Sequence, residues 1–293
     1  MQQYHDRSYE RHAAHARDHA TSVPSVLGNP GSIDAHRHER MYTFAKPLLS
    51  MYPDATWLTV GDTGADAQSL KNLGATNIIC SSLSTAQIVE MRNLGHLDSF
   101  ETREINAEAI DLADDSVDFV LCKESYHHFP RPAIAVYELL RVCRRGVVFI
   151  EPAEPTGWKP LDSLKTAIKS VLRRKAAIMH EFEASGNYLY RLSKRELTKQ
   201  AVALQLGNVA SLYFNDFFHA RLSPKKMNDP VPRMLFELGV FVQNTLARLR
   251  LMNYGLIVYV LFKENLTTDQ IEKLRSANFS VEELPRNPYF EID

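Results

Sequence analysis

Residues 116–155 constrain the fold of this chain more than any other stretch. An apolar run at 117–122 leads into a polar, histidine-rich turn at 123–132. A segment with helical spacing follows at 133–144, and a second apolar run at 146–150 comes just before the end of the stretch. Two short buried strands joined by a helix form a parallel crossover unit. Because ligands of open parallel sheets bind beyond the carboxyl ends of the strands, the polar residues after both runs are expected to line a site.

Titratable side chains cluster directly after these two expected strands. Those after the first run are Lys123, Glu124, Tyr126, His127 and His128, and those after the second are Glu151 and Glu154. Imidazole titrates near neutrality, so His127 and His128 are the candidate catalytic bases. Adjacent residues in extended backbone point to opposite sides, so we expect one of the two to face the cleft. The alternative is that one packs beneath the following helix and the other bonds to the backbone. Glu151 is expected to be a buried, satisfied carboxylate, with orientation of a histidine as the alternative.

The rest of the chain alternates strand-like and helix-like stretches. Further strands are expected at 56–60, 77–80, 100–105, 208–214 and 255–262. Helices are expected at 34–49, 67–73, 85–94, 193–204, 234–251 and 267–278, together with a basic amphipathic helix at 161–180. Asp34 and Ser84 are the predicted N-caps of the first and third of these helices, and Pro47 should interrupt the first. The alternation indicates a doubly wound sheet, with the uninterrupted apolar run at 255–262 at or near its centre.

Two polar features carry alternatives of their own. The turn at 61–66 follows the first expected strand and leads into a helix; such a turn can cradle an anionic or polar cofactor group, or simply connect the two elements. In the N-terminal stretch, His12, His15 and His19 fall on one face of an expected helix. A solvated helix face is favoured there over a metal site, because no Cys or carboxylate completes an obvious ligand set.

Size and composition bound the class of protein. With 293 residues, the chain is long enough for one large α/β domain with insertions or for two small domains. Its net charge of −1 gives no argument for nucleic acid or a membrane surface as partner. Cys80, Cys122 and Cys143 are expected to be buried free thiols. No run approaches the ~20 apolar residues of a spanning helix and no apolar leader is evident, so the cytoplasm is the expected location.

The order of elements and one run of motifs resemble the class I S-adenosylmethionine-dependent methyltransferases, most closely the methyltransferase-type-11 branch. The motifs are Asp114-Asp115-Ser116-Val117-Asp118-Phe119-Val120, then His127-His128-Phe129, then Glu138-Leu139-Leu140-Arg141-Val142, and finally Gly146. The resemblance covers residues 56–155 and the last two strands in outline. It implies a Rossmann-like, doubly wound, mostly parallel sheet of seven strands, with a helical cover at 1–50. The main domain would occupy 51–293, with acceptor-side insertions at about 156–205 and 215–253.

The resemblance also implies a cofactor, S-adenosylmethionine, and the residues around it. Gly61, Asp62 and Gly64 would approach its methionine part, and Lys123 is a further cofactor-binding candidate. Ser82 and Leu83, at the end of the second strand, would meet the ribose, and Asn106 and Ala107 would lie at the adenine edge. The implied activity is methyl transfer to a small-molecule acceptor, such as a hydroxyl of a sugar or secondary metabolite. A homodimer is left open.

Three departures from the family pattern motivate a different reading. One is the turn Gly61-Asp62-Thr63-Gly64-Ala65, which is short of glycine and in which Asp62 could partly replace a missing acid. Thr59 stands where the family has an acid before the glycine turn, and Ser82 stands where it has the ribose-binding carboxylate. A serine offers the ribose diol weaker, neutral hydrogen bonds, at a cost of about 1–3 kcal/mol. The alternative function is therefore a catalytically inactive, methyltransferase-like binding or regulatory protein. For an active enzyme, four cations of the second insertion are candidates for a phosphate or carboxylate on the acceptor: Arg221, Lys225, Lys226 and Arg233.

Overall fold

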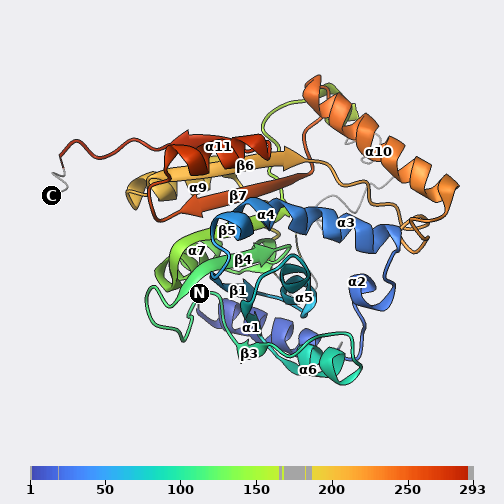
Figure 1. Cartoon of the computed structure of the whole chain (residues 1–293), viewed down its shortest axis with the longest axis horizontal. Coiled ribbons are helices and arrows are strands. Elements are labelled where there is room, and N and C mark those ends of the chain that lie inside the picture. Colours follow the sequence, from blue (N-terminus) through green and yellow to red (C-terminus); the bar gives the residue numbers. More distant parts are fainter. Residues whose placement is uncertain (1, 19, 165–166, 168–181, 183–186, 290–293) are drawn as a thin grey trace.

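The computed structural model describes residues 2–18, 20–164, 167, 182 and 187–289. Within this part of the chain, eight strands form one sheet in the order β3-β2-β1-β4-β5-β7-β6-β8 (Figure 1). The strands are β1 (Thr56–Val60), β2 (Asn77–Ser82), β3 (Glu101–Glu104), β4 (Val117–Lys123), β5 (Cys143–Pro152), β6 (Asn208–Phe214), β7 (Leu256–Phe262) and β8 (Ser280–Glu283). Strands β1 to β5 pair in parallel, whereas β7 runs antiparallel to both of its neighbours. The carboxyl ends of β1, β2, β3, β4 and β5 therefore meet at one edge of the sheet.

Helices cover both faces of this sheet. The described α-helices are α1 (Gln2–Asp18), α2 (Ser25–Gly28), α3 (Ile33–Tyr42), α4 (Lys46–Met51), α5 (Ala65–Asn72), α6 (Ala86–Asn93), α7 (Pro132–Val142), α9 (Lys194–Ala203), α10 (Pro230–Arg248) and α11 (Thr268–Ser276). Side chains of α3, α4, α5, α6 and α11 share one apolar core with one face of the sheet, and those of α7 and α9 share a second core with the other. Figure 1 shows α10 lying apart from these two layers.

The strands feed the two cores by alternation. In β4, Phe119 and Leu121 belong to the first core, while Val120 and Cys122 belong to the second. All seven residues of β4 and of β7 are buried, which is the pattern of strands covered on both faces. The doubly wound arrangement and the internal place of 255–262 therefore agree with the sequence-based expectation.

Several local expectations differ from the structure. The sheet has an eighth strand, β8, which pairs antiparallel with β6 although its short sequence carries no apolar run. The expected helix at 34–49 is split by a 3-10 turn at Thr43–Ala45 before Pro47, and its N-cap is Ser32 rather than Asp34. The helix expected at 161–180 lies mostly outside the described residues. The division into a cover at 1–50 and a main domain stays a prediction.

Two smaller findings concern caps and cysteines. Thr85, not Ser84, is the N-cap residue of α6, and it makes no side-chain capping bond. Cys80, Cys122 and Cys143 are free and buried, as expected. Among the described helices, none combines the length and apolarity needed to cross a bilayer.

Candidate active site

The turn after β1 is held together by the carboxylate of Asp62. This side chain accepts hydrogen bonds from the backbone N–H groups of Gly64 (2.7 Å), Asp66 (3.0 Å) and Ala67 (2.9 Å). It also accepts a bond from the Thr59 hydroxyl at 2.8 Å, and the residue is only 2% exposed. Asp62 therefore shapes the turn and the first turn of α5, and its contact with a cofactor stays a prediction.

Glycine is required where this turn meets the turn after β4. Gly61 has φ +72°, and a Cβ there would lie 2.5 Å from the Oγ of Ser125. The Ser125 hydroxyl instead lies 3.2 Å from the Gly61 carbonyl oxygen and 3.0 Å from that of Lys123. Gly64, with φ +97°, begins α5. The two turns at the carboxyl ends of β1 and β4 are thus in direct contact.

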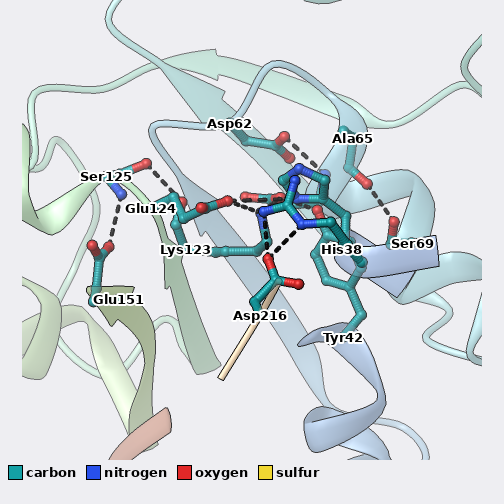
Figure 2. A network of polar contacts seen from close by, with 12 residues as sticks. His38, Tyr42, Asp62, Ala65, Ser69, Lys123, Glu124, Ser125, Glu151 and Asp216 are labelled. Carbon is teal, nitrogen blue, oxygen red and sulfur yellow. Dashed lines mark hydrogen bonds and ion pairs between the residues drawn. The ribbon is translucent and has the colours of Figure 1, made fainter. Parts of the chain in front are cut away.

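A cluster of buried charges lies beside these turns, beneath α3. The Lys123 ammonium donates to Glu124 Oε2 at 2.7 Å and to His38 Nδ1 at 3.0 Å. Its nitrogen lies 3.9 Å from Asp66 Oδ1 and 5.2 Å from the ring centre of Tyr42, whose hydroxyl donates to Asp66. The Lys123 side chain is 5% exposed. Figure 2 shows that His38 and Tyr42 reach into this cluster from α3, so α3 covers the carboxyl ends of β1 and β4.

Burial shifts the pKa values of the cluster in opposite directions for acids and bases. Burial, with the nearby Asp62 carboxylate, raises the pKa of Asp66 to about 7. Burial, with the Lys123 ammonium, lowers the pKa of His38 to about 4. Burial alone would lower the pKa of Lys123, but Asp66 and Glu124 together raise it. At neutral pH, His38 is therefore neutral and accepts a hydrogen bond from a charged Lys123.

A second group of polar residues follows β4 and β5. Glu151 is 0% exposed, and its Oε1 accepts from the backbone N–H groups of Ser125 (2.7 Å) and Tyr126 (2.8 Å). Its Oε2 lies 2.7 Å from Nδ1 of His127. Because a carboxylate can only accept, Nδ1 of His127 carries a proton and donates this hydrogen bond. Glu151 is therefore a buried carboxylate satisfied by hydrogen bonds, as expected, and it also contacts His127, as the alternative expected.

His127 and His128 do not lie in extended backbone. Both belong to a 3-10 turn (Tyr126–His128), so the alternation expected of a strand does not apply to them. Their ring centres are 4.0 Å apart, and the ring of His12 from α1 lies 5.9 Å from that of His128. The backbone oxygen of His128 accepts a hydrogen bond from Asn187 at 2.6 Å. The two histidine rings are thus neighbours at a tilted angle of 41°, and His12 of α1 lies against His128.

The residues assigned to ribose and adenine lie along the ends of β2 and β3. Ser82 pairs in register with Glu104, whose Oε1 accepts from the Thr85 backbone N–H at 3.1 Å. Asn106 Oδ1 accepts a hydrogen bond from the backbone N–H of Glu108, two residues later, and so caps a local turn. Leu83 is half-buried and Ala107 is 3% exposed. Whether these side chains touch a cofactor stays a prediction.

Two of the four cations of the second insertion, Lys226 and Arg233, have partners outside this cluster. Lys226 donates to Asn29 Oδ1 and to the Pro30 carbonyl, so it ties the insertion to the N-terminal segment. Arg233 pairs with Glu237 on the exposed face of α10. Among the described residues, no group of three or more His, Cys, Asp or Glu side chains could hold a metal ion.

Comparisons with known proteins agree with this architecture. Residues 58–150, from β1 into β5, match the family model of a methyltransferase domain. No curated protein matches the chain. The solved magnesium protoporphyrin IX methyltransferase of Synechocystis PCC 6803, with bound SAH, is 11% identical over 85% of this chain and 98% of its own, with a TM-score of 0.50. The geranyl diphosphate C-methyltransferase of Streptomyces coelicolor A3(2) is 15% identical over 88% and 98%, with a TM-score of 0.49. At these identities the likeness concerns the fold alone, and it confirms the Rossmann-like α/β class.

Proposed function

We propose that this chain, which contains a class I methyltransferase domain over residues 58–150, transfers the methyl group of S-adenosylmethionine to a hydroxyl of a small molecule. S-adenosylmethionine supplies a methyl group already activated on a sulfonium centre. The protein then contributes alignment and, for a hydroxyl acceptor, a base. The observation that supports this proposal best is the bond between His127 and the buried Glu151, because His127 lies two positions after Ser125, which touches the glycine turn.

The buried cluster fits the polar end of this cofactor. The methionine part carries an ammonium, a carboxylate and a sulfonium, and the cluster offers both signs of charge. Asp66 and Glu124 are suited to the cationic groups, and Lys123 to the carboxylate. The Tyr42 ring, which faces the Lys123 ammonium at 5.2 Å, can receive a cation. Because α3 covers these groups, α3 has to move for a ligand to reach them.

Glu104 is our candidate for the missing ribose-binding acid. The family carboxylate after β2 is replaced by Ser82, but the register of β2 and β3 puts Glu104 directly beside it. Directly opposed residues on neighbouring strands share a face of the sheet, so the carboxylate is within reach of the same ligand group. Its bond to the Thr85 N–H holds it in place. A diol bound by Glu104 and Ser82 would keep one charge-assisted contact.

In the proposed reaction, His127 is the base. With S-adenosylmethionine bound, its Nε2 would take the proton of the acceptor hydroxyl, whose oxygen would receive the methyl group with release of S-adenosylhomocysteine, while Nδ1 stays bonded to Glu151. The imidazolium that forms lies against a carboxylate that is 0% exposed, and this contact stabilises its charge. The His127 side chain is 16% exposed, so part of it can be reached by a hydroxyl group.

A second function has its own supporting observation. The Lys123 ammonium pairs with Glu124 and lies near Asp66, so the chain's own lysine already satisfies the acidic groups suited to a methionyl ammonium. Together with Thr59 and Ser82, this contact favours a protein that keeps the fold without binding the methyl donor.

One experiment separates the two functions. Calorimetric titration with S-adenosylhomocysteine should show saturable binding, and methyl transfer to hydroxyl acceptors should fall when His127 is replaced by alanine. Absence of binding to folded protein at millimolar ligand would exclude the methyltransferase function. Binding without turnover of any acceptor, or turnover unchanged in His127→Ala, would exclude the proposed role of this histidine.

A further inference from the structure

We infer that a groove beside α9, outside the candidate active site, binds a small organic anion. The groove consists of two hollows of ≈ 810 Å³ and ≈ 330 Å³, and both are lined by Glu154, Thr156 and Tyr213. Because these three residues belong to both linings, the two hollows lie next to each other. Their volumes are in the range of pockets that hold small organic ligands. The inference does not depend on the proposed methyl transfer.

The side chains that line this groove carry a large excess of positive charge. Its cations are Lys159, Lys194, Arg195, Lys199, Arg248 and Arg250, and Glu154 is the one carboxylate among the lining residues. The whole chain carries 34 Lys and Arg against 35 Asp and Glu. The groove therefore departs strongly from the balance of the rest of the molecule, and it presents a positive potential to a ligand.

Most of these cations are not neutralised by the protein itself. Lys194 is the exception, because its ammonium pairs with Glu282 and donates a hydrogen bond to Ser211. In the described part of the chain, no ion pair or side-chain hydrogen bond is made by five of the lining cations: Lys159, Arg195, Lys199, Arg248 and Arg250. Arg195 and Lys199 lie four residues apart on α9, so they project from one face of that helix. Several unpaired cations around a depression favour an anion with more than one acidic oxygen, such as a phosphate ester.

Apolar and aromatic side chains supply the body of the groove. Val202 lines the larger hollow and Met252 the smaller. Tyr213 lines both hollows, and its ring centre lies 6.0 Å from that of Tyr254, which lines the smaller one. Such a surface favours an organic body over a bare inorganic ion, because burying the ring or chain of a ligand adds hydrophobic free energy.

The groove and the candidate active site have different lining residues, but residues 190–192 connect them through backbone hydrogen bonds. The backbone of 190–192 bonds to the His127 carbonyl oxygen on one side and to Pro152 and Glu154 on the other. The next residue, Ser193, lines the groove and caps α9. A ligand in the groove therefore contacts the segment that follows directly from the surroundings of His127, while His127 itself is not part of the lining.

The test is calorimetric titration of the full chain with phenyl phosphate and with inorganic phosphate, without any methyl donor. We expect saturable binding of phenyl phosphate that weakens as salt is raised, and at least about tenfold weaker binding of inorganic phosphate. The double variants Arg195→Gln/Lys199→Gln and Lys159→Gln/Arg248→Gln should each weaken phenyl phosphate binding about tenfold or more. These four side chains are not in the core, so circular dichroism should show unchanged folding.

Arg275→Gln is the matched control, because Arg275 is an exposed cation on α11 that does not line the groove. Binding of phenyl phosphate should be the same in this variant as in the wild type. Absence of saturable binding, equal affinity for the two phosphates, or equal losses in Arg275→Gln and the groove variants would each overturn the inference. Since no methyl donor is present, these outcomes do not bear on the proposed methyl transfer.

Discussion

Glu151 Oε2 lies 2.7 Å from Nδ1 of His127, while the other oxygen of the same carboxylate accepts two backbone N–H bonds. The two backbone N–H bonds hold the Glu151 carboxylate in place, and the carboxylate in turn keeps the proton of His127 on Nδ1. Because Glu151 is 0% exposed, water does not compete for these bonds. The pair therefore holds the His127 ring in one orientation, with Nδ1 against Glu151, at the carboxyl edge of the sheet.

Replacement of Glu151 by glutamine should impair methyl transfer about as much as removal of His127. The amide oxygen of the new side chain can keep the backbone bonds, but its NH₂ group would donate to Nδ1. The proton would then move to Nε2, which could no longer accept one from the acceptor. A loss of about 10²- to 10⁴-fold in kcat is expected, with unchanged affinity for S-adenosylhomocysteine.

Glu272→Gln is the control for this change, because Glu272 is an exposed carboxylate on α11. It should leave kcat unchanged. If Glu151→Gln kept most of the activity, or lost it only in proportion to a loss of folded protein, the tautomer argument would be wrong.

The centre of the fold was predictable because the inner strands of the sheet are rich in apolar residues. β4 and β7 are buried on both faces, so their sequences are unbroken apolar runs. β8 was missed because an edge strand of four residues, half-buried at best, needs no such run. The cap at Ser32 was missed because Asp34, two residues later, is an equally good capping residue in sequence.

The candidate site was less predictable because it combines residues that are far apart in the chain. His38 and Tyr42 enter it from α3, 81 or more positions before Lys123, and nothing in their local sequence indicates this contact. Asp66 and Glu104 were missed for the same reason. Glu151 could be placed at the end of a strand, but its bond to His127 depends on the register of β4 and β5 and on the 3-10 turn.

The raised pKa of Asp66 predicts a pH dependence of stability. Its folded-state pKa is about 7, well above the value near 4 of an unfolded aspartate, so folding favours the protonated form. The contribution of Asp66 to stability is therefore complete below about pH 4 and is lost as pH rises through 7. Urea unfolding between pH 4 and 8 should show the wild type losing stability relative to Asp66→Asn, by on the order of a few kcal/mol.

Asp54→Asn serves as the reference, since Asp54 is exposed just before β1. Its stability should follow that of the wild type across the same pH range. Parallel curves for the wild type and Asp66→Asn would show instead that Asp66 titrates normally in the folded protein.

His38 should make the stability of α3, which covers the buried charges around Lys123, sensitive to acid. Burial and the Lys123 ammonium lower its folded-state pKa to about 4, below the unfolded value of about 6.5. The stability that this neutral histidine contributes is present above pH 6.5 and is lost as pH falls through 4. Hydrogen exchange of the α3 amides should therefore speed up in acid, and His38→Gln should remove that dependence. The result would contradict this account if α3 and α7 lost protection equally.

The ion pair between Arg37 and Asp216 should control how readily α3 opens. The Arg37 guanidinium bonds to Asp216 through Nε at 2.7 Å and through a second nitrogen, and it also pairs with Asp34. Both side chains are nearly buried, at 9% and 4% exposure, so loss of one partner leaves a poorly hydrated charge. Asp216→Ala should destabilise α3 by about 1–3 kcal/mol, because Asp34 remains as a partner.

Hydrogen exchange can localise this effect. The amides of α3 should exchange about tenfold faster or more in Asp216→Ala, while those of β4 and β7 change little. Glu237→Ala breaks an exposed pair with Arg233 on α10 and should have almost no effect, as is usual for surface pairs. Because α3 covers Lys123, association of S-adenosylhomocysteine, measured by stopped flow, should also be faster in Asp216→Ala. Unchanged α3 exchange would show that the packing of Met41 and Tyr42, rather than this ion pair, holds the cover closed.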